Sequence, residues 1–241
     1  ENLYQFARLD RRVAVVTDSG VPAQYAQMVA DQCKDAHIIT VPQGEASKSF
    51  KILESVLRQM LEFGMGRGDL VIAVGGGVVG DLAGFAASIY MRGIDFINCP
   101  TTTLSMIDSS IGGKTAVDLG DTKNIVGAFW QPKLVIVDPD PLAPLPRRHF
   151  INGLAEAVKA SLLADPELFA IFENGDVDAQ IGEIICRSLR FKKNIVEQDE
   201  TEQGMRKALN FGHTIGHGIE AVKGIKGRRT VGLYHGECVA L

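Results

Sequence analysis

Short runs of β-branched residues alternate with helical patterns along the first part of the chain. Residues 21–33 and 47–63 carry apolar side chains at three- and four-residue spacing, which is typical of helices packed on one side. The predicted strands are residues 13–17, 37–41, 70–74, 96–99 and 134–137. Strands and helices that alternate in this way predict a parallel sheet with helices on both faces.

After residue 145 the strand pattern disappears. A cluster of prolines at positions 139, 141, 144 and 146 predicts a connecting segment there, because proline continues neither element type. The helices predicted beyond it are residues 151–163, 166–173, 177–197 and 206–222. We therefore expect an α/β chain with a parallel-sheet, nucleotide-binding domain over residues 1–145 and an all-α domain over residues 146–241.

The composition excludes several classes of protein. A chain of 241 residues that is 46% hydrophobic can bury a core without disulfide staples. The 25 basic and 29 acidic residues leave no positive excess for a nucleic-acid backbone. Four dispersed cysteines without a C-x-x-C pair fit a reduced compartment, so we expect a cytoplasmic protein. No run of about 20 apolar residues and no signal peptide is visible, so no membrane partner is expected.

Three glycines at positions 75–77 follow a predicted strand and precede a helical pattern. Glycine lets a backbone approach a ligand closely, and a helix N-terminus offers free N–H groups to phosphate. The pattern fits a dinucleotide pyrophosphate or tight packing alone, because the spacing is not G-x-G-x-x-G. Asp81 stands in an apolar helical context, where a carboxylate is costly unless it meets a ligand hydroxyl or a capping donor.

The segment over residues 100–118 is rich in hydroxyl groups and also holds Asp108, two adjacent glycines and Lys114. We expect a loop there. An ammonium after two glycines can reach a phosphate as a mobile charge, which favours a polar anionic ligand over a plain solvated loop.

Three histidines and one glutamate form a candidate metal site. His213 and His217 stand at i and i+4 in an apolar helical context, so both project from one face. His235 follows them, and Glu156 shares a helix face with Lys159. One carboxylate and two imidazoles with an open position form a catalytic zinc set, although core histidines would have similar spacing. Together with the glycines and the anion loop, this set indicates a nicotinamide enzyme whose metal activates a hydroxyl.

Six segments of the chain together resemble the 3-dehydroquinate synthase family: GGGVVGD, TTTLSMIDSSIGGKTAVD, KNIVGAFWQP, LPRRHFINGLAEAVK, LNFGHTIGHGIE and YHGE. The resemblance implies a nucleotide-binding α/β domain, a helical domain and an active site in the cleft between them. It also implies the conversion of 3-deoxy-D-arabino-heptulosonate 7-phosphate to 3-dehydroquinate and phosphate, with NAD used and regenerated in each turnover. That reaction belongs to the shikimate pathway of aromatic amino acid biosynthesis.

The resemblance further implies roles for individual residues. A zinc or cobalt ion would be held by Glu156, His213 and His235, with His217 close by for proton handling. The catalytic residues would be Asp108, Lys114, Lys159 and His217. The substrate would be bound by Arg92, Lys114, Asn124, Lys159, Lys192, Arg206, Asn210 and His217. NAD would be bound by Asp18, Glu45, Lys48, Gly76, Gly77, Asp81, Thr101, Thr102 and Lys123. Arg92 matches an arginine lent to the neighbouring subunit, which implies a homodimer.

Two features depart from the family pattern. The segment between His217 and His235 is longer, and we expect a mobile loop there; the family's helical domain also continues past Leu241, so the chain is expected to be truncated. The alternatives are a sister cyclase acting on sedoheptulose 7-phosphate or glucose 6-phosphate, a metal-dependent alcohol dehydrogenase, and a non-catalytic NAD-binding fragment. Because the sister substrates lack a carboxylate, Lys192, Arg206 and Asn210 favour the synthase.

Overall fold

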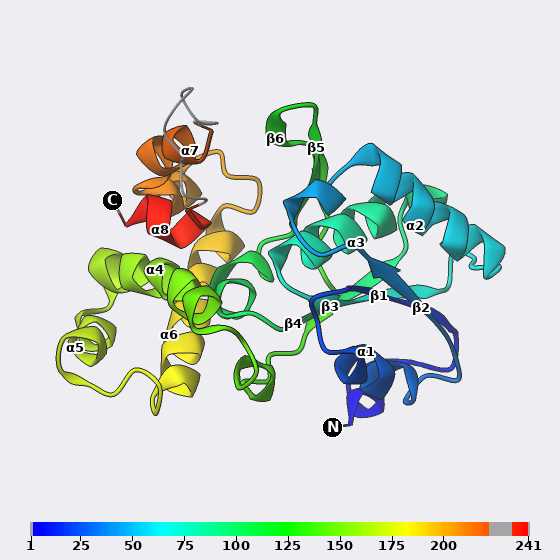
Figure 1. Ribbon diagram of the computed structural model, residues 1–241, viewed down its shortest axis with the longest axis horizontal. Coiled ribbons are helices and arrows are strands. Elements are labelled where there is room, and N and C mark those ends of the chain that lie inside the picture. The colour runs from blue at the N-terminus through cyan, green and yellow to red at the C-terminus, as the bar shows by residue number, and fades with distance from the viewer. Residues whose placement is uncertain (1, 222–232, 241) are drawn as a thin grey trace. The chain divides into compact units, whose positions relative to one another are not determined.

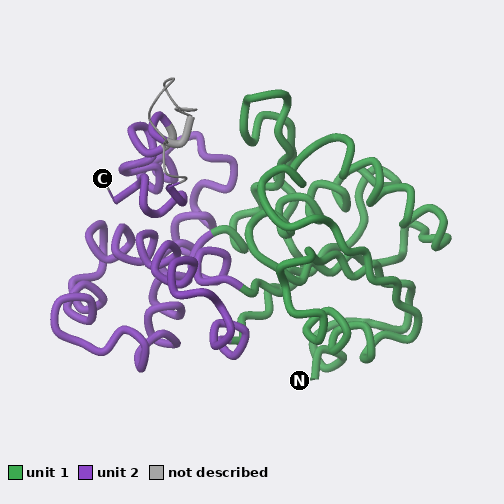
Figure 2. Tube along the Cα trace, viewed as in Figure 1, with its two compact units in different colours: residues 1–101, 109–138 green, residues 102–108, 139–241 purple. Residues whose placement is uncertain are grey.

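The computed structural model describes residues 2–221 and 233–240 and divides into two compact units (Figure 2). Unit 1 comprises Glu1–Thr101 and Ser109–Asp138, and unit 2 comprises Thr102–Asp108 and Pro139–Leu241. The division differs from the predicted boundary at residue 145, because it follows Asp138 and assigns the short segment Thr102–Asp108 to unit 2. That segment packs on helix α4 (Arg147–Ala164), where a Cβ at Gly153 would lie 2.2 Å from the backbone nitrogen of Leu104.

Unit 1 is built on a five-stranded parallel sheet (Figure 1). Its strands are β1 (Arg12–Asp18), β2 (Asp35–Val41), β3 (Leu70–Gly75), β4 (Asp95–Pro100) and β7 (Leu134–Val135). The spatial order is β2-β1-β3-β4-β7, and every neighbouring pair is parallel. All five predicted strands are therefore confirmed, although the last is only two residues long.

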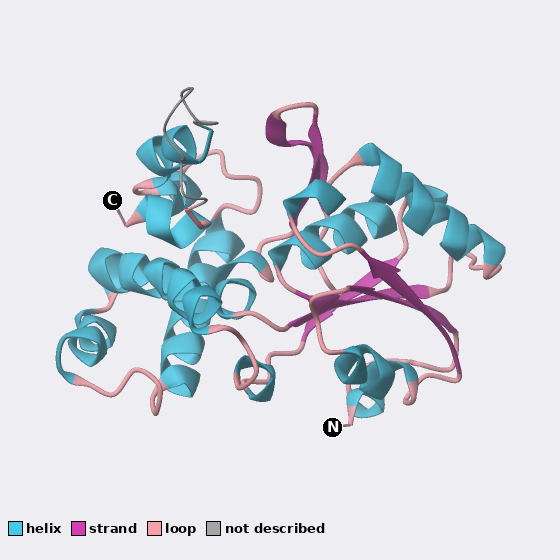
Figure 3. Ribbon diagram, in the orientation of Figure 1, coloured by secondary structure: helices cyan, strands magenta, loops and turns pink. Residues whose placement is uncertain are grey.

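Helices cover both faces of this sheet (Figure 3). Helix α1 (Ala23–Ala30) lies on one face, and α2 (Phe50–Glu62) and α3 (Gly77–Ile89) lie on the other. Successive β1 side chains point to opposite faces. Val13 and Val15 therefore pack with α1, while Ala14 and Val16 pack with α2 and α3. Both helices predicted here are shorter than expected at both ends, since Pro22 and Ser49 are their N-caps and Asp31 and Phe63 are their C-caps.

A two-stranded antiparallel hairpin, β5 (Lys114–Leu119) and β6 (Thr122–Phe129), completes unit 1. The loop predicted over residues 100–118 is therefore wrong for residues 114–118, which belong to β5. The turn consists of Gly120 and Asp121, and Gly120 has a φ of +61°, which glycine adopts without strain. The strand packs on α3, where a Cβ at Gly84 would lie 2.5 Å from the methyl group of Thr115.

The described residues of unit 2 form helices and connecting loops, without a strand. Besides α4, its helices are α5 (Pro166–Asn174), α6 (Ile181–Gln198), α7 (His213–Ala221) and α8 (His235–Val239). The single helix predicted over 206–222 is wrong, because a 3-10 helix, η6 (Met205–Asn210), ends before Gly212, whose φ is +79°. Most of the segment expected to be a mobile loop, residues 222–232, lies outside the described residues.

The remaining helical turns are η1 (Leu3–Gln5), η2 (Glu45–Ser47), η3 (Tyr90–Arg92), the π-helical η4 (Ser105–Ser109) and η5 (Asp140–Leu142). Among the described residues, no helix has both the length and the apolarity needed to cross a membrane.

Candidate metal and nucleotide sites

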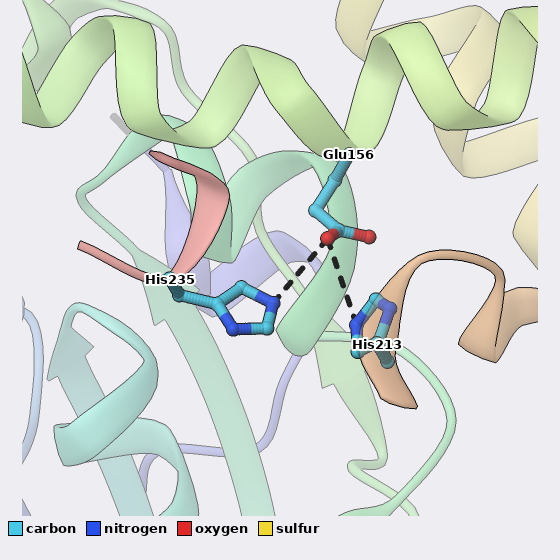
Figure 4. A group of neighbouring side chains, drawn as sticks. All are labelled: Glu156, His213 and His235. Atoms are coloured by element: carbon cyan, nitrogen blue, oxygen red, sulfur yellow. Dashed lines mark ion pairs between the residues drawn. The ribbon is translucent and has the colours of Figure 1, made fainter. Parts of the chain in front are cut away.

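Glu156, His213 and His235 converge within unit 2 (Figure 4). Glu156 projects from α4, and the two histidines are the first residues of α7 and α8. One oxygen or nitrogen from each residue lies within 4.8 Å of the others. Glu156 Oε1 is 3.3 Å from His235 Nε2 and 3.7 Å from His213 Nε2. The structure thus brings together the three residues that the family resemblance implied as ligands.

The Glu156 carboxylate is buried, and its two oxygens have different surroundings. Oε2 accepts a hydrogen bond from Lys159, whereas Oε1 has no hydrogen-bond donor among the described residues. Burial alone would raise the pKa of Glu156, but the nearby His235 imidazole and the charge and hydrogen bond of Lys159 outweigh it and lower that pKa. A buried, ionised oxygen that accepts no hydrogen bond raises the free energy of the folded state. A cation between Oε1 and the two imidazoles would remove that cost, so the donor set fits a divalent metal ion.

His213 has the protonation state that a metal ligand needs. Burial lowers its pKa more than the charge of Glu156 raises it, so the imidazole is neutral at pH 7. His213 Nδ1 lies 3.2 Å from the carbonyl oxygen of Phe211. The tautomer that donates Nδ1–H to this carbonyl leaves a lone pair on Nε2, on the side of Glu156. His217 lies in α7, but its side chain is outside the described part of the structure.

Two buried lysines beside these residues are each paired with a carboxylate. Lys159 donates to Glu156 and to the carbonyl oxygen of Leu209, at 2.6 Å for the latter. Lys192 donates to both the side-chain Oδ1 and the backbone oxygen of Asp108, each at 2.7 Å. Burial would raise the pKa of Asp108, but the charges of Lys192 and Lys159 lower it to about 2. Asp108 is therefore ionised at neutral pH and accepts hydrogen bonds.

Arg206 and Asn210, both predicted to bind substrate, make their hydrogen bonds to the segment after α6. The Arg206 side chain is fully buried and donates to the carbonyl oxygen of Glu200. Asn210 is exposed and donates from its amide to Glu202 at 2.7 Å. Asp199 organises this segment by accepting the backbone N–H of residues 203, 204 and 206.

In unit 1, the predicted nucleotide residues gather where the strand order reverses. Strand β1 has β2 on one side and β3 on the other, and α/β sheets bind ligands at the carboxyl ends of such strands. Asp18 ends β1, and its carboxylate accepts the N–H of Gly20 at 2.7 Å. Gly76 is the N-cap of α3, directly after β3. The N–H of Thr101 donates to the carbonyl of Gly75 at 2.9 Å, so Thr101 lies beside the glycine turn.

Glycine is required at the end of β3. A Cβ at Gly75 would lie 2.6 Å from the side chain of Val79, one turn into α3, so a larger residue would push the helix from the strand. The free N–H groups of the first turn of α3 therefore stay close to the sheet edge.

Lys48 connects predicted nucleotide and substrate residues. Its ammonium is buried, lies 2.6 Å from Asp81 and donates to the amide oxygen of Asn124. Burial lowers the pKa of Lys48, but the charge of Asp81 outweighs it and the net shift is upward. Asp81 thus has Lys48 as a partner inside unit 1, and its contact with a ligand hydroxyl stays a prediction. Lys123 forms a more exposed pair with Glu45, at 3.7 Å.

The remaining predicted residues are dispersed. Lys114 is exposed at the start of β5. Arg92 is exposed in the turn after α3, with a left-handed φ of +70°. Thr102 belongs to unit 2, unlike the other predicted NAD residues, and its hydroxyl is 2.8 Å from that of Ser105.

The comparisons with known proteins cover most of the chain. The family model described as 3-dehydroquinate synthase N-terminal matches residues 38–152, and the one described as 3-dehydroquinate synthase C-terminal matches residues 153–241. The chain belongs to the 3-dehydroquinate synthase family.

Two curated relatives illustrate the match, and both are named 3-dehydroquinate synthase. The protein from Caulobacter vibrioides is 47% identical over 96% of this chain and 64% of the relative. The protein from Thermodesulfovibrio yellowstonii is 41% identical over 100% of this chain and 68% of the relative. This chain spans only part of such relatives: 64% of the length of the Caulobacter vibrioides protein, 59% of one from Clostridium perfringens and 65% of one from Lactiplantibacillus plantarum.

Solved structures of related cyclases superpose well. A 2-deoxy-scyllo-inosose synthase complexed with carbaglucose-6-phosphate, NAD+ and Co2+ gives a TM-score of 0.86 at 31% identity, over 96% of this chain and 65% of that one. A 2-epi-5-epi-valiolone synthase from Streptomyces hygroscopicus, with NAD+ and Zn2+ bound, gives 0.85 at 31% identity, over 96% and 66%. A glycerol dehydrogenase from Schizosaccharomyces pombe, at 20% identity and a TM-score of 0.62 over 99% and 64%, shares the fold.

The sequence analysis missed the residues of α4 that contact the segment carrying His235. The side chain of Asn152 accepts the N–H of Gly236 at 2.7 Å, and Arg148 pairs with Glu237. The available signal is spacing, because Arg148, Asn152 and Glu156 follow one another at four-residue intervals and lie along one side of α4.

Proposed function

We propose that this chain carries the metal, nucleotide and substrate groups of a 3-dehydroquinate synthase, which converts 3-deoxy-D-arabino-heptulosonate 7-phosphate to 3-dehydroquinate and phosphate. The observation that carries the proposal is the convergence of Glu156, His213 and His235 around a buried carboxylate oxygen without a donor. Curated relatives named for this activity are 41% to 47% identical to the chain.

Glu156, His213 and His235 would hold a zinc or cobalt ion. Related cyclases at 31% identity have been solved with Co2+ or Zn2+. Such an ion, when bound, polarises a substrate oxygen as a Lewis acid. Around it, Lys159 orients the Glu156 carboxylate through Oε2, and the Phe211 carbonyl holds the His213 ring in the tautomer that leaves Nε2 unprotonated.

NAD would bind at the carboxyl edge of the sheet in unit 1. Bound NAD accepts a hydride and returns it, so the overall conversion has no net redox change. The first turn of α3, capped by Gly76, offers backbone N–H groups to the pyrophosphate. The Lys48 ammonium, held by Asp81 and Asn124, adds a buried positive charge on the same unit.

The carboxylate and the phosphate of the substrate would be met by Lys114, Lys159, Lys192 and Arg206, together with the amides of Asn124 and Asn210. Lys159 and Lys192 form ion pairs with the carboxylates of Glu156 and Asp108. Neither ammonium is therefore an unpaired buried charge before the substrate anion binds. Asp108, with a pKa of about 2, would accept a hydrogen bond from a substrate hydroxyl. We propose a homodimer in which the exposed Arg92 reaches the site of the second copy.

The test is phosphate release from 3-deoxy-D-arabino-heptulosonate 7-phosphate in the presence of NAD and zinc, with NADH absorbance followed in parallel. We expect release that a chelator abolishes, without accumulation of NADH. Sedoheptulose 7-phosphate serves as the control substrate, and release from it alone would indicate a sister cyclase instead. Accumulating NADH would indicate a dehydrogenase, and no release from either compound would contradict the proposal.

A further inference from the structure

Helix α8 is too short to fix the position of its own first residue. It comprises only five residues, His235–Val239, and isolated helices of that length are not stable in water. The place of His235 beside Glu156 must therefore come from contacts between α8 and the rest of unit 2.

A bidentate ion pair connects the first turn of α8 to the first turn of α4. Arg148 Nε and Nη2 donate to Glu237 Oε1 and Oε2, each at 2.7 Å, in the geometry that suits a guanidinium and a carboxylate best. Glu237 Oε2 also accepts the backbone N–H of Tyr234 at 2.8 Å. The Glu237 carboxylate thus connects Arg148 to the chain on both sides of His235, through the Tyr234 N–H before it and through Glu237 itself after it.

The ring of Tyr234 adds a second contact to the same turn of α4. The Arg148 guanidinium lies 4.1 Å from the centre of that ring, within cation–π range. The His149 ring stacks on it with centroids 4.7 Å apart and planes 23° apart. The residue before His235 is therefore held by two neighbouring side chains of α4.

The backbone after His235 is held by Asn152. Its side-chain oxygen accepts the buried N–H of Gly236 at 2.7 Å. The two backbones are in contact here, since a Cβ at Gly236 would lie 1.9 Å from the carbonyl oxygen of Asn152. Glu156 follows Asn152 by one helical turn, so one rigid helix supplies a ligand and also carries the segment of the other ligand.

We propose that Arg148 and Glu237 are positioning residues for the metal site, because their contact fixes His235 at its distance from Glu156. This inference rests on the proposed function, in which Glu156, His213 and His235 hold a divalent ion. Partners that orient metal ligands typically contribute about 10- to 100-fold in metal affinity. We expect an effect in that range from the loss of either residue.

Arg147 offers a matched control on the same helix. Arg147 forms a bidentate ion pair with Asp178, in which Nη2 lies 3.0 Å from Oδ2. Its guanidinium also lies 4.8 Å from the centre of the Phe150 ring. Its side chain is about as exposed as that of Arg148, at 59% against 45%. Arg147→Met therefore removes interactions of the same kind that do not involve α8.

The experiment measures the Co2+ affinity of the metal-free full chain by competition with a chromophoric chelator, together with the visible absorption of the bound Co2+. We expect Arg148→Met and Glu237→Gln each to weaken binding about 10- to 100-fold and to change the Co2+ spectrum. The double variant should bind Co2+ no more weakly than Arg148→Met alone, because both substitutions remove the same ion pair. Arg147→Met should bind like the wild type, with a melting temperature close to that of Arg148→Met.

Wild-type affinity in both Arg148→Met and Glu237→Gln would overturn the inference, as would an equal loss in Arg147→Met. Glu237→Gln keeps an acceptor for the Tyr234 N–H, so it provides a reading even if Arg148→Met folds poorly. A wild-type chain that binds no Co2+ would overturn the proposed metal site itself, which distinguishes the two failures.

Discussion

Gly153 is the point at which α4 touches the segment Thr102–Asp108, and its replacement by alanine gives a quantitative test of that packing. The new Cβ would lie 2.2 Å from the Leu104 nitrogen and 2.6 Å from the Thr103 carbonyl carbon, whereas ordinary contact begins at 3.4 Å. Both atoms belong to the backbone, so no side-chain rotation relieves the overlap. The helix and the segment must move apart.

Two energies of opposite sign decide the outcome. Alanine is favoured over glycine in a helix interior by about 1 kcal/mol, and overpacking costs about 1–3 kcal/mol, at the upper end when only backbone can yield. We expect Gly153→Ala to lower the free energy of unfolding by roughly 1–2 kcal/mol. The segment ends at Asp108, which accepts from Lys192 at 2.7 Å, so its displacement should also weaken substrate binding.

The assay is urea unfolding at pH 7, followed by circular dichroism and compared with Gly182→Ala. Gly182 lies in the first turn of α6 with nothing within 4 Å of its Cβ position, so that variant should be as stable as the wild type or slightly more stable. A Gly153→Ala variant as stable as Gly182→Ala would refute the packing argument.

Three further predictions concern the two sites and the helical unit. Lys48→Met removes the buried partner of Asp81 and should weaken NAD binding about tenfold or more in calorimetry, without changing metal affinity. Asp165→Ala removes the N-cap of α5 and should cost about 1 kcal/mol in urea unfolding. Burial raises the pKa of Asp165, but the α5 N-terminus and Arg187 outweigh it, so this difference should persist above about pH 4 and shrink below. Zinc at about one hundred times its dissociation constant should stabilise the wild type by about 2.7 kcal/mol and leave Glu156→Ala unchanged in thermal unfolding.

The sheet could be predicted from the sequence because each strand is a buried apolar run and each is followed by a helical pattern. Residues 70–74, for example, are buried on both faces, which is typical of a central parallel strand. The hairpin was missed although its turn carries a known signal, Gly120 and Asp121 between two alternating segments. The apolar pattern across residues 206–222 concealed a break, because periodicity alone does not show that Gly212 adopts a left-handed conformation.

The candidate site was predictable in its residue types but not in its geometry. Spacing favoured His213 and His217 as a pair, whereas the structure places His235, more than twenty residues along the chain from His213, beside Glu156. The ion-pair partners of the buried charged residues could not be predicted from the sequence either. Lys48 and Asp81 are far apart in the chain, and only the packing of unit 1 brings them together.

The central claim is that Glu156, His213 and His235 hold one metal ion, and the most direct measurement is zinc stoichiometry after equilibrium dialysis. The wild-type chain should retain one equivalent of zinc, and Glu156→Ala, His213→Ala and His235→Ala should each lose it. His37→Ala, in β2 of unit 1, should retain it. Retention of a full equivalent by the Glu156, His213 and His235 variants, or no zinc on the wild type, would contradict the account.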